Sequence, residues 1–349
     1  MTRPFLLLAL AAGLAAPLSA QHYETIAFES FDYVTPSFLG GAAGGSGWAD
    51  VWWSGNNGDQ AQVDLPGFDA VGGKATTLVD NGGSWREIDR TGFDYLLSGP
   101  YEFGADNTTI WVNFRAQRSA GSDDDYGGLS LYTKFVGEKI FLGSPSFTTE
   151  WGLHDIAGGS LSGETVTGSS DAAESHLVYR LDFLPGDDRI RLWIDPASAH
   201  PSTTADLDVT VADFTFNEIR IQSGSSITAT GFDFDEILID TPSVRPIYSI
   251  GNLVAGSVAT LDIINATPGS TVLIGYSVTG AGPTTTPFGD VAMSPPILQL
   301  PPQTADVNGE VHLPVGVPIS ALGLTLYTQA GELSGGGAIL SNALAEVVQ

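Results

Sequence analysis

Cysteine is absent from the 349 residues of this chain. Its absence excludes disulfide bonds, thiol chemistry, cysteine-ligated zinc and iron–sulfur clusters. An exported protein without disulfides has to be stabilised by a large hydrophobic core, by bound metal ions, or by both. The chain is long enough to bury such a core, in one large domain or in two ordinary ones.

Positive charge is scarce as well. The chain has 13 Lys and Arg against 40 Asp and Glu, which gives a formal net charge of −27. A surface of this charge repels phosphate backbones and anionic membranes, and it attracts divalent cations. Nucleic acid is therefore excluded as a partner.

Long apolar runs are missing everywhere except at the beginning. Residues 1–20, MTRPFLLLALAAGLAAPLSA, have one positive charge at Arg3, then an apolar run, then small residues. This order predicts a secretory signal peptide that is cleaved after Ala20. The apolar run is shorter than the ~20 residues that a membrane-spanning helix needs. We therefore expect a secreted protein, extracellular or at the cell surface, whose mature chain does not insert into a membrane.

Strand patterns dominate from Ile26 to Asp240, whereas no window after the signal peptide shows a sustained helical period. The segment TIWVNFRAQ (109–117) alternates between apolar and polar residues, as a strand with one buried face does. The segments 176–183 and 189–195 flank LPGDD, which predicts a β-hairpin. The 43 glycines are spread along the chain in turn-like positions. The sequence predicts an all-β fold.

A change of composition divides the chain. The segment TPSVRP (241–246) has two prolines, and residues 242–246 are predicted to form a linker between a domain at 21–241 and another at 247–349. The second domain has fewer acids and many short strand patterns, and DVNGE (306–310) has the Asn-Gly pair typical of a tight hairpin. Its length and strand content predict a small immunoglobulin-like β-sandwich.

Eight segments follow one another within residues 24–241: ESFDY, GGAAGGSGW, KIFLGSP, WGL, HLVYRLDF, DDRIRLWIDP, FNEIRIQSG and FDEILID. This order resembles the LamG-like, concanavalin A-like jelly rolls of the lectin/glucanase superfamily in secreted bacterial proteins. The tail resembles a small domain that often follows such modules. The resemblance implies two curved antiparallel sheets with adjacent first and last strands, frequent calcium, and frequent binding of glycan or protein. It does not imply catalysis, because the superfamily includes both lectins and enzymes.

A catalytic motif is incomplete. Retaining glucanases of this superfamily have Glu-x-Asp-x-(x)-Glu on one strand, so that two carboxylates lie close together. The segment WREIDRTGF supplies Glu87 and Asp89, but Arg90, Thr91 and Gly92 follow where the acid should be. The chain also lacks Gly-x-Ser-x-Gly and His-Glu-x-x-His. We therefore predict no catalytic residues and no enzyme.

Calcium is the predicted cofactor, because oxygen ligands from loops and strand ends suit this ion. The candidate ligands are Glu29 and Asp32 near the first strand, and Asp233, Asp235 and Glu236 near the last. If these strands are neighbours, one ion could join the ends of the domain. A second acidic run contains Asp123, Asp124 and Asp125. The alternative is that these acids are solvated strand and loop charges.

The apolar phase changes within GFDFDEILID (231–240). Phe232 and Phe234 share one face of a regular strand, whereas Ile237 and Ile239 share the other. Two explanations are open: a β-bulge near Asp235 and Glu236, or a Glu236 side chain that points to the buried face and needs a metal or an arginine as its partner.

Aromatic residues near glycine-rich stretches are candidates for stacking on sugar rings. They are Trp48, Trp52, Trp53, Trp85 and Tyr126. Trp52 and Trp53 would point to opposite faces of a strand, and packing in the core is the alternative for each residue. The sequence favours a non-catalytic protein that binds extracellular polysaccharide or cell-surface glycan. The alternatives are a structural or adhesive surface protein with protein partners and, third, a divergent polysaccharide-degrading enzyme.

Overall fold

The computed structural model describes residues 22–35, 37–54, 61–68, 70–77, 82–121, 125–224, 231–334 and 337–349. The predicted signal peptide lies outside these ranges. Within them, no helix has the length and apolar character of a membrane span. The described chain divides into two compact units, Tyr23–Pro242 and Ser243–Gln349, the second of which includes His22.

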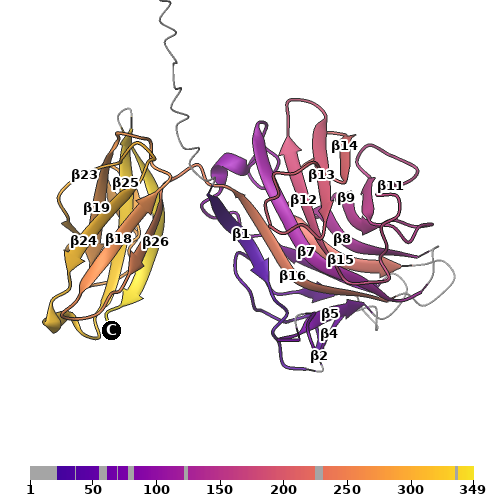
Figure 1. Cartoon of the computed structure of the whole chain (residues 1–349), viewed down its shortest axis with the longest axis horizontal. Coiled ribbons are helices and arrows are strands. Elements are labelled where there is room, and N and C mark those ends of the chain that lie inside the picture. The colour runs from indigo at the N-terminus through magenta and orange to yellow at the C-terminus, as the bar shows by residue number, and fades with distance from the viewer. Residues whose placement is uncertain are drawn as a thin grey trace, which may run out of the picture. The chain divides into compact units, whose positions relative to one another are not determined.

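The N-terminal unit is built from strands β1 to β16 and one 3-10 turn, η1 (Asp94–Leu96) (Figure 1). The strands are β1 Tyr23–Glu29, β2 Ser37–Phe38, β3 Trp53–Ser54, β4 Ala61–Asp64, β5 Lys74–Thr77, β6 Gly82–Glu87, β7 Thr108–Ala120, β8 Tyr126–Thr133, β9 Gly137–Ser144, β10 Gly152–Asp155, β11 Glu164–Thr165, β12 Ser175–Phe183, β13 Asp188–Ile194, β14 Leu207–Val211, β15 Glu218–Gly224 and β16 Gly231–Pro242.

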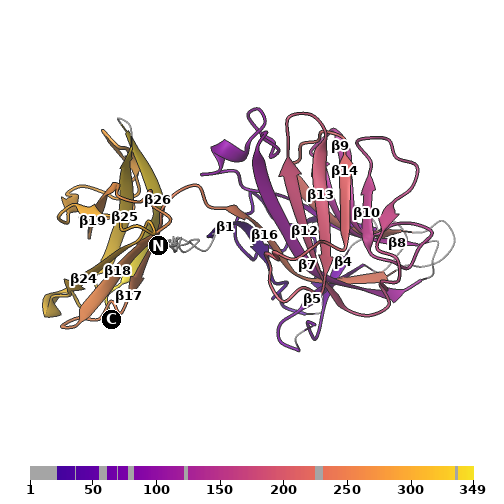
Figure 2. The ribbon, with the colours of Figure 1, turned by 45° about the horizontal axis from the view of Figure 1, so that its top comes forward.

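These strands form two antiparallel sheets. The nine-stranded sheet has the order β14-β13-β12-β7-β16-β5-β4-β2, with β1 also paired to β16. Figure 2 shows β7, β12 and β13 side by side in this sheet. The seven-stranded sheet has the order β11-β10-β9-β8-β15-β6-β3. The prediction of an all-β sandwich is confirmed, as are the β12–β13 hairpin and the adjacency of the first and last strands.

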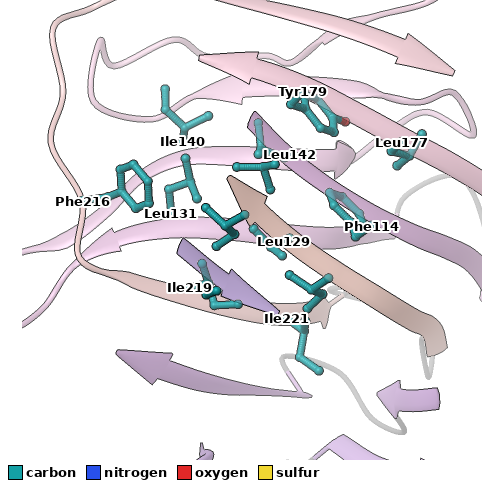
Figure 3. Packing of buried hydrophobic residues seen from close by; sticks show 14 of the residues in the cluster. Phe114, Leu129, Leu131, Ile140, Leu142, Leu177, Tyr179, Phe216, Ile219 and Ile221 are labelled. Carbon is teal, nitrogen blue, oxygen red and sulfur yellow. The ribbon is translucent and has the colours of Figure 1, made fainter. Parts of the chain in front are cut away.

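The core lies between the two sheets. Alternate residues of neighbouring strands point into it, because successive side chains of a strand face opposite sides. Figure 3 shows one part of this layer, where fully buried residues of the seven-stranded sheet meet those of the nine-stranded sheet: Leu129, Leu131, Ile140, Leu142, Ile219 and Ile221 against Phe114, Leu177 and Tyr179. The Tyr179 hydroxyl joins the layers by donating to the Gly152 carbonyl at 2.6 Å. This core stabilises the unit without disulfides.

A β-bulge in β16 explains the change of apolar phase. The register between β16 and β7 shifts between Asp235 and Leu238, and Glu236 has φ 49°. The extra residue lets the phenylalanines before it and the isoleucines after it point into the same core. The Glu236 side chain remains 41% exposed and pairs with Arg115 Nε at 2.9 Å. Of the two explanations, the bulge is therefore correct.

Substitutions at Glu236 test this bulge. Glycine adopts positive φ without a Cβ clash, so Glu236→Gly is expected to be neutral or stabilising by up to about 1 kcal/mol. A β-branched residue is strained there, so Glu236→Val should cost about 1–2 kcal/mol. Both variants lose the same exposed ion pair. The difference between their unfolding free energies in urea therefore measures the backbone strain at position 236. A glycine variant less stable than the valine variant would rule the bulge out.

The C-terminal unit is a small sandwich. Its elements are β17 Ile247–Gly251, β18 Val258–Ile264, β19 Thr271–Ser277, β20 Thr284–Thr286, β21 Gly289–Val291, β22 Leu298–Gln299, β23 Gln303–Thr304, β24 Val311–Gly316, η2 Ile319–Ala321, β25 Thr325–Ser334 and β26 Gly337–Val347. The sheets are β17-β18-β24, β22-β19-β25-β26 with β23 on β19, and the β20-β21 ribbon. Buried Tyr248, Ile263, Val272 and Ile274 belong to one core cluster.

The Asn-Gly turn of this unit is not a hairpin. Gly309 N donates to the Asp306 carbonyl, which closes a tight turn as the sequence predicts. However, β23 before the turn pairs with β19, and β24 after it pairs with β18. The turn therefore joins strands of different sheets, because tertiary pairing overrides the local hairpin preference.

Candidate functional site

The predicted sugar-binding aromatics separate into two groups. Trp53 on β3 and Trp85 on β6 are direct cross-strand partners on the outer face of the seven-stranded sheet, the face away from the core. Trp53 is 52% exposed and Trp85 is half-buried. Tyr126 on β8 lies on the same face. These three side chains remain candidates for ligand contact.

Trp52 and Trp48 belong to the interior side instead. Trp52 is fully buried and donates from Nε1 to Glu29 Oε2 at 2.9 Å, so the prediction that it contacts sugar is wrong. Trp48 is half-buried, packs against the core cluster and donates to the Phe28 carbonyl. Its ring also lies 5.0 Å from the Arg86 guanidinium carbon. The other three tryptophans, Trp111, Trp151 and Trp193, are buried.

Strand register places a continuous row of side chains across the outer face. Each member is the direct partner of the next, and β3, β6, β15, β8, β9 and β10 contribute one each. The row is Trp53, Trp85, Arg220, Ser130, Phe141 and His154. Five strand spacings of ~4.8 Å give this row a length of about 24 Å. It is therefore long enough to contact an extended chain.

The adjoining row is nearly all glycine. It consists of Gly83, Gln222, Gly128, Gly143 and Gly152. The Phe141 ring lies so low over Gly128 that a Cβ there would meet it at 2.8 Å. Arg220 leans over Gly83 in the same way, with Nε 3.1 Å from a Cβ at that position. The backbone also leaves no room for a Cβ, which would lie 2.2 Å from the Leu142 carbonyl oxygen at Gly128 and 2.6 Å from the Ile221 carbonyl oxygen at Gly83, so glycine is required at both positions.

A pocket of about 350 Å³ opens on this face between β8, β9, β10 and β15. Its lining combines rings with polar groups: Tyr126, Tyr132, Glu138, Phe141, Pro145, Ser146, His154, Ile156, Arg220 and Gln222. We refer to it as the outer-face pocket. A concave site with aromatic walls and a few convergent polar groups is the usual form of a small-ligand site.

Glu138 is the central acceptor of the outer-face pocket. A β-bulge in β9 places Glu138, rather than Lys139, opposite Tyr132. Its Oε1 accepts from Ser130 Oγ and from Gln222 Nε2, and its Oε2 accepts from the Tyr132 hydroxyl at 3.3 Å. Burial raises the pKa of Tyr132 to about 12, and the Glu138 charge adds to the rise. Tyr132 is therefore a neutral donor, and Glu138 can still accept from hydroxyl groups of a ligand.

Two further carboxylates lie on the outer face beyond Tyr132. Glu87 and Glu218 are direct cross-strand partners, a relation that brings Cβ atoms to about 5 Å. Glu87 Oε1 accepts from Arg90 at 2.7 Å and Oε2 from Lys134 at 2.6 Å. Burial alone would raise the pKa of Glu87, but these hydrogen bonds outweigh it and lower the pKa. Glu218 is only 8% exposed, and burial raises its pKa to about 7.

The Glu218 pKa makes stability depend on pH. A folded-state pKa above the ordinary 4.5 means that the folded chain holds this proton more tightly than the unfolded chain. Its contribution is fully present below pH 4.5 and is lost as the pH rises through about 7. Glu218→Gln, which resembles the protonated form, should therefore be more stable than wild type at high pH, by on the order of 2 kcal/mol. Denaturation should show no such gain at low pH, and an equal gain at both ends would contradict the assignment.

The predicted calcium ligands have protein partners. Glu29 is buried and accepts from Phe31 N, the Tyr33 hydroxyl, Trp52 Nε1 and Arg86 Nη1. Asp233 accepts from Lys74 Nζ at 2.7 Å and from Thr76 Oγ1. Arg86 and Lys74 already pair with these two carboxylates. Glu29 and Asp233 are therefore not suited to bind one calcium ion between them.

The other three predicted ligands bind chain segments nearby. Asp32 accepts from Ser30 Oγ and Gly73 N, Asp235 accepts from Phe68 N and Glu236 N, and Glu236 pairs with Arg115. Across the described ranges, no group of three or more His, Asp or Glu could hold a metal ion. Asp123 and Asp124 lie outside those ranges, and Asp125 is buried beside Arg118. Calcium binding stays a prediction, which melting with calcium and with a chelator would test.

No protein-family model and no curated protein matches the chain. The chain is similar to a solved structure that belongs to work on endo-acting O-glycanases, which members of the human gut microbiota express to initiate mucin breakdown. The TM-score is 0.37 and the identity 8%, over 62% of this chain and 98% of that one.

Two further solved structures are similar at a comparable level. A Trypanosoma rangeli sialidase in complex with the inhibitor DANA has TM-score 0.33 and 11% identity, over 62% of this chain and 30% of the sialidase. A protein of unknown function from Shewanella oneidensis has TM-score 0.38 and 13% identity, over 69% and 96%. At these scores the likeness carries no conclusion about function. The site itself defines a β-sandwich protein with a polar, aromatic-lined pocket on one sheet.

Proposed function

We propose that the N-terminal unit binds a glycan on the outer face of its seven-stranded sheet and does not cleave it. The observation that carries this proposal is the row from Trp53 and Trp85 to the outer-face pocket. Pyranose rings expose apolar C–H faces that pack on aromatic rings, while their hydroxyl groups need donors and acceptors. The row offers both along one line.

In the proposed complex, sugar rings pack on Trp85 and on the exposed Trp53. Hydroxyl groups of the next sugar donate to Glu138 and accept from Arg220, which line the pocket together. The hydrogen bonds from Ser130 and Gln222 hold Glu138 in place before the ligand arrives. This preorganisation lowers the entropic cost of binding.

Binding without cleavage is supported by the state of the acids. A retaining glycosidase needs an ionised carboxylate free to attack and a second one that protonates the leaving oxygen. Both oxygens of Glu87 are held by cationic side chains, and Glu218 beside it is almost completely buried. Neither carboxylate is free for such a reaction. We further propose that the protein acts outside the cell or at its surface, with a concanavalin A-like sandwich as its binding module.

A glycan array with the full chain tests the proposal. We expect selective binding to glycans that share one saccharide, and no new reducing ends when these glycans are incubated with the protein. A clean negative on a broad array would contradict the proposal and favour an adhesive protein with protein partners. Release of new reducing ends would favour a polysaccharide-degrading enzyme.

A further inference from the structure

We propose that the outer-face pocket recognises a saccharide that carries a carboxylate, such as a uronic acid, through Arg220. This inference rests on the proposed glycan binding and names the class of glycan.

Among the residues that the structure describes, Arg220 has no carboxylate partner, although the chain is rich in acids. The N-terminal unit contains seven other described arginines, and each forms an ion pair: Arg86, Arg90, Arg115, Arg118, Arg180, Arg189 and Arg191. Arg220 pairs with none of the described carboxylates, although the whole chain has 40 acids against 13 basic residues. The site therefore leaves one guanidinium available to an anion from outside the chain.

The surroundings of Arg220 remove water from part of its charge. Its guanidinium carbon lies 5.7 Å from the Trp85 ring centre and 5.9 Å from the Tyr132 ring centre. Its Nε is buried and has no hydrogen-bond partner among the described residues. These rings offset only part of the hydration free energy that the guanidinium loses in this place. An oppositely charged partner would offset the rest of that loss. The two rings also limit the orientations of the guanidinium plane before a ligand binds.

The described acids on the outer face near Arg220 form no ion pair with it, although the Arg220 charge acts on Glu218 and its guanidinium hydrogen-bonds the Tyr132 hydroxyl. Glu138 directs its oxygens to Ser130, Gln222 and Tyr132, three donors that are not charged. Burial raises the pKa of Glu218 to about 7, so this neighbour is largely protonated in mildly acidic solution. A guanidinium without an ion-pair partner is well suited to bind a carboxylate, because two parallel N–H groups can donate to the two carboxylate oxygens. A sugar carboxylate would occupy that position while its ring remains on the aromatic row.

The negative charge of the whole chain does not prevent this contact. Exposed charges farther away than about 8 Å are largely screened at physiological ionic strength. A contact inside the pocket is screened much less, because the groups are in direct hydrogen-bonding range. We therefore expect recognition of one acidic sugar in the pocket and no general affinity for polyanions.

Isothermal titration calorimetry of the full chain at physiological ionic strength tests the inference. The probes are tetrasaccharides of galacturonic, glucuronic and mannuronic acid together with their methyl esters, which keep the ring and remove the charge. We expect at least one acid to bind about tenfold more tightly than its ester. Arg220→Gln should abolish this difference, and Arg220→Lys should restore it only in part because the paired donors are lost. Arg189→Gln, an exposed arginine paired with Asp208 on the other sheet, is the matched control and should behave like wild type.

Each outcome decides between the two proposals. Equal binding of acids and esters, or tighter binding of neutral tetrasaccharides, would overturn the role of Arg220 and leave glycan binding intact. Competition by sodium acetate as strong as that by the uronates would also overturn it, since a simple anion site would then be sufficient. If no saccharide binds, neutral or acidic, both proposals fail. Should the Arg220→Gln chain not fold, the acid and ester comparison on the wild-type chain still decides.

Discussion

Replacing Arg86 by methionine is expected to lower the free energy of unfolding of the N-terminal unit by about 3–5 kcal/mol. Arg86 and Glu29 form a buried ion pair of 2.8 Å, with side-chain exposures of 4% and 1%. Arg86 also donates to the carbonyl oxygens of Gly44 and Asp50. Methionine fills a similar space but leaves the Glu29 charge and both carbonyls without this partner. The large cost comes mainly from that uncompensated buried charge.

Tryptophan fluorescence during denaturation measures this effect, because all seven tryptophans lie between Trp48 and Trp193 in the N-terminal unit. The matched control is the double variant Glu29→Gln with Arg86→Met, which removes both charges and should recover part of the loss. Calcium should not rescue the single variant. A cost below about 1 kcal/mol would be typical of an exposed pair and would contradict the buried contact described here.

Replacing Trp85 by alanine is expected to weaken glycan binding by about 30-fold or more, close to 2 kcal/mol. Trp85 is the second member of the proposed binding row, between Trp53 and Arg220. Its loss removes a stacking surface and one of the two rings that orient the Arg220 guanidinium. Trp53→Ala should have a smaller effect, because Trp53 lies at the end of the row and is more exposed.

The control for these variants is Phe135→Ala. Phe135 is an aromatic residue in the turn between β8 and β9, 98% exposed and outside the row, so its removal should leave binding unchanged. Calorimetry with the glycan selected on the array measures all three variants, and melting curves check that each chain is folded. Equal losses for Trp85→Ala and Phe135→Ala would exclude the row as the binding surface.

Local patterns were sufficient for much of the fold. The LPGDD turn between two segments predicted the hairpin at 176–195. The shift of apolar phase after Phe234 left two explanations open, and the structure shows that the β-bulge in β16 is the correct one. The alternation of Trp52 and Trp53 also predicted opposite faces. Which tryptophan points to the core is decided by the pairing of Trp53 with Trp85 on β6 and by the hydrogen bond from Trp52 to Glu29. These contacts involve distant residues, so the local segment does not reveal them.

The site was predicted only in part, because it depends on non-local strand order. β15 lies between β6 and β8 although it follows both by many residues in the chain. Arg220 and Gln222 were therefore missed, as were Tyr132 and Glu138. One signal was present: EIRIQSG (218–224) alternates, so Glu218, Arg220 and Gln222 share the face opposite Ile219 and Ile221. The contact of Glu29 with Arg86 was missed for the same reason, since the inward direction of Arg86 follows from the pairing of β6.

The most direct test of the account is a crystal structure of the full chain with the glycan selected on the array. We predict electron density for a saccharide on the outer face of the seven-stranded sheet, with one ring against Trp85 and another sugar in the pocket beside Arg220 and Glu138. Saccharide bound only on the nine-stranded sheet or only on the C-terminal unit, with the outer-face pocket holding solvent, would contradict it.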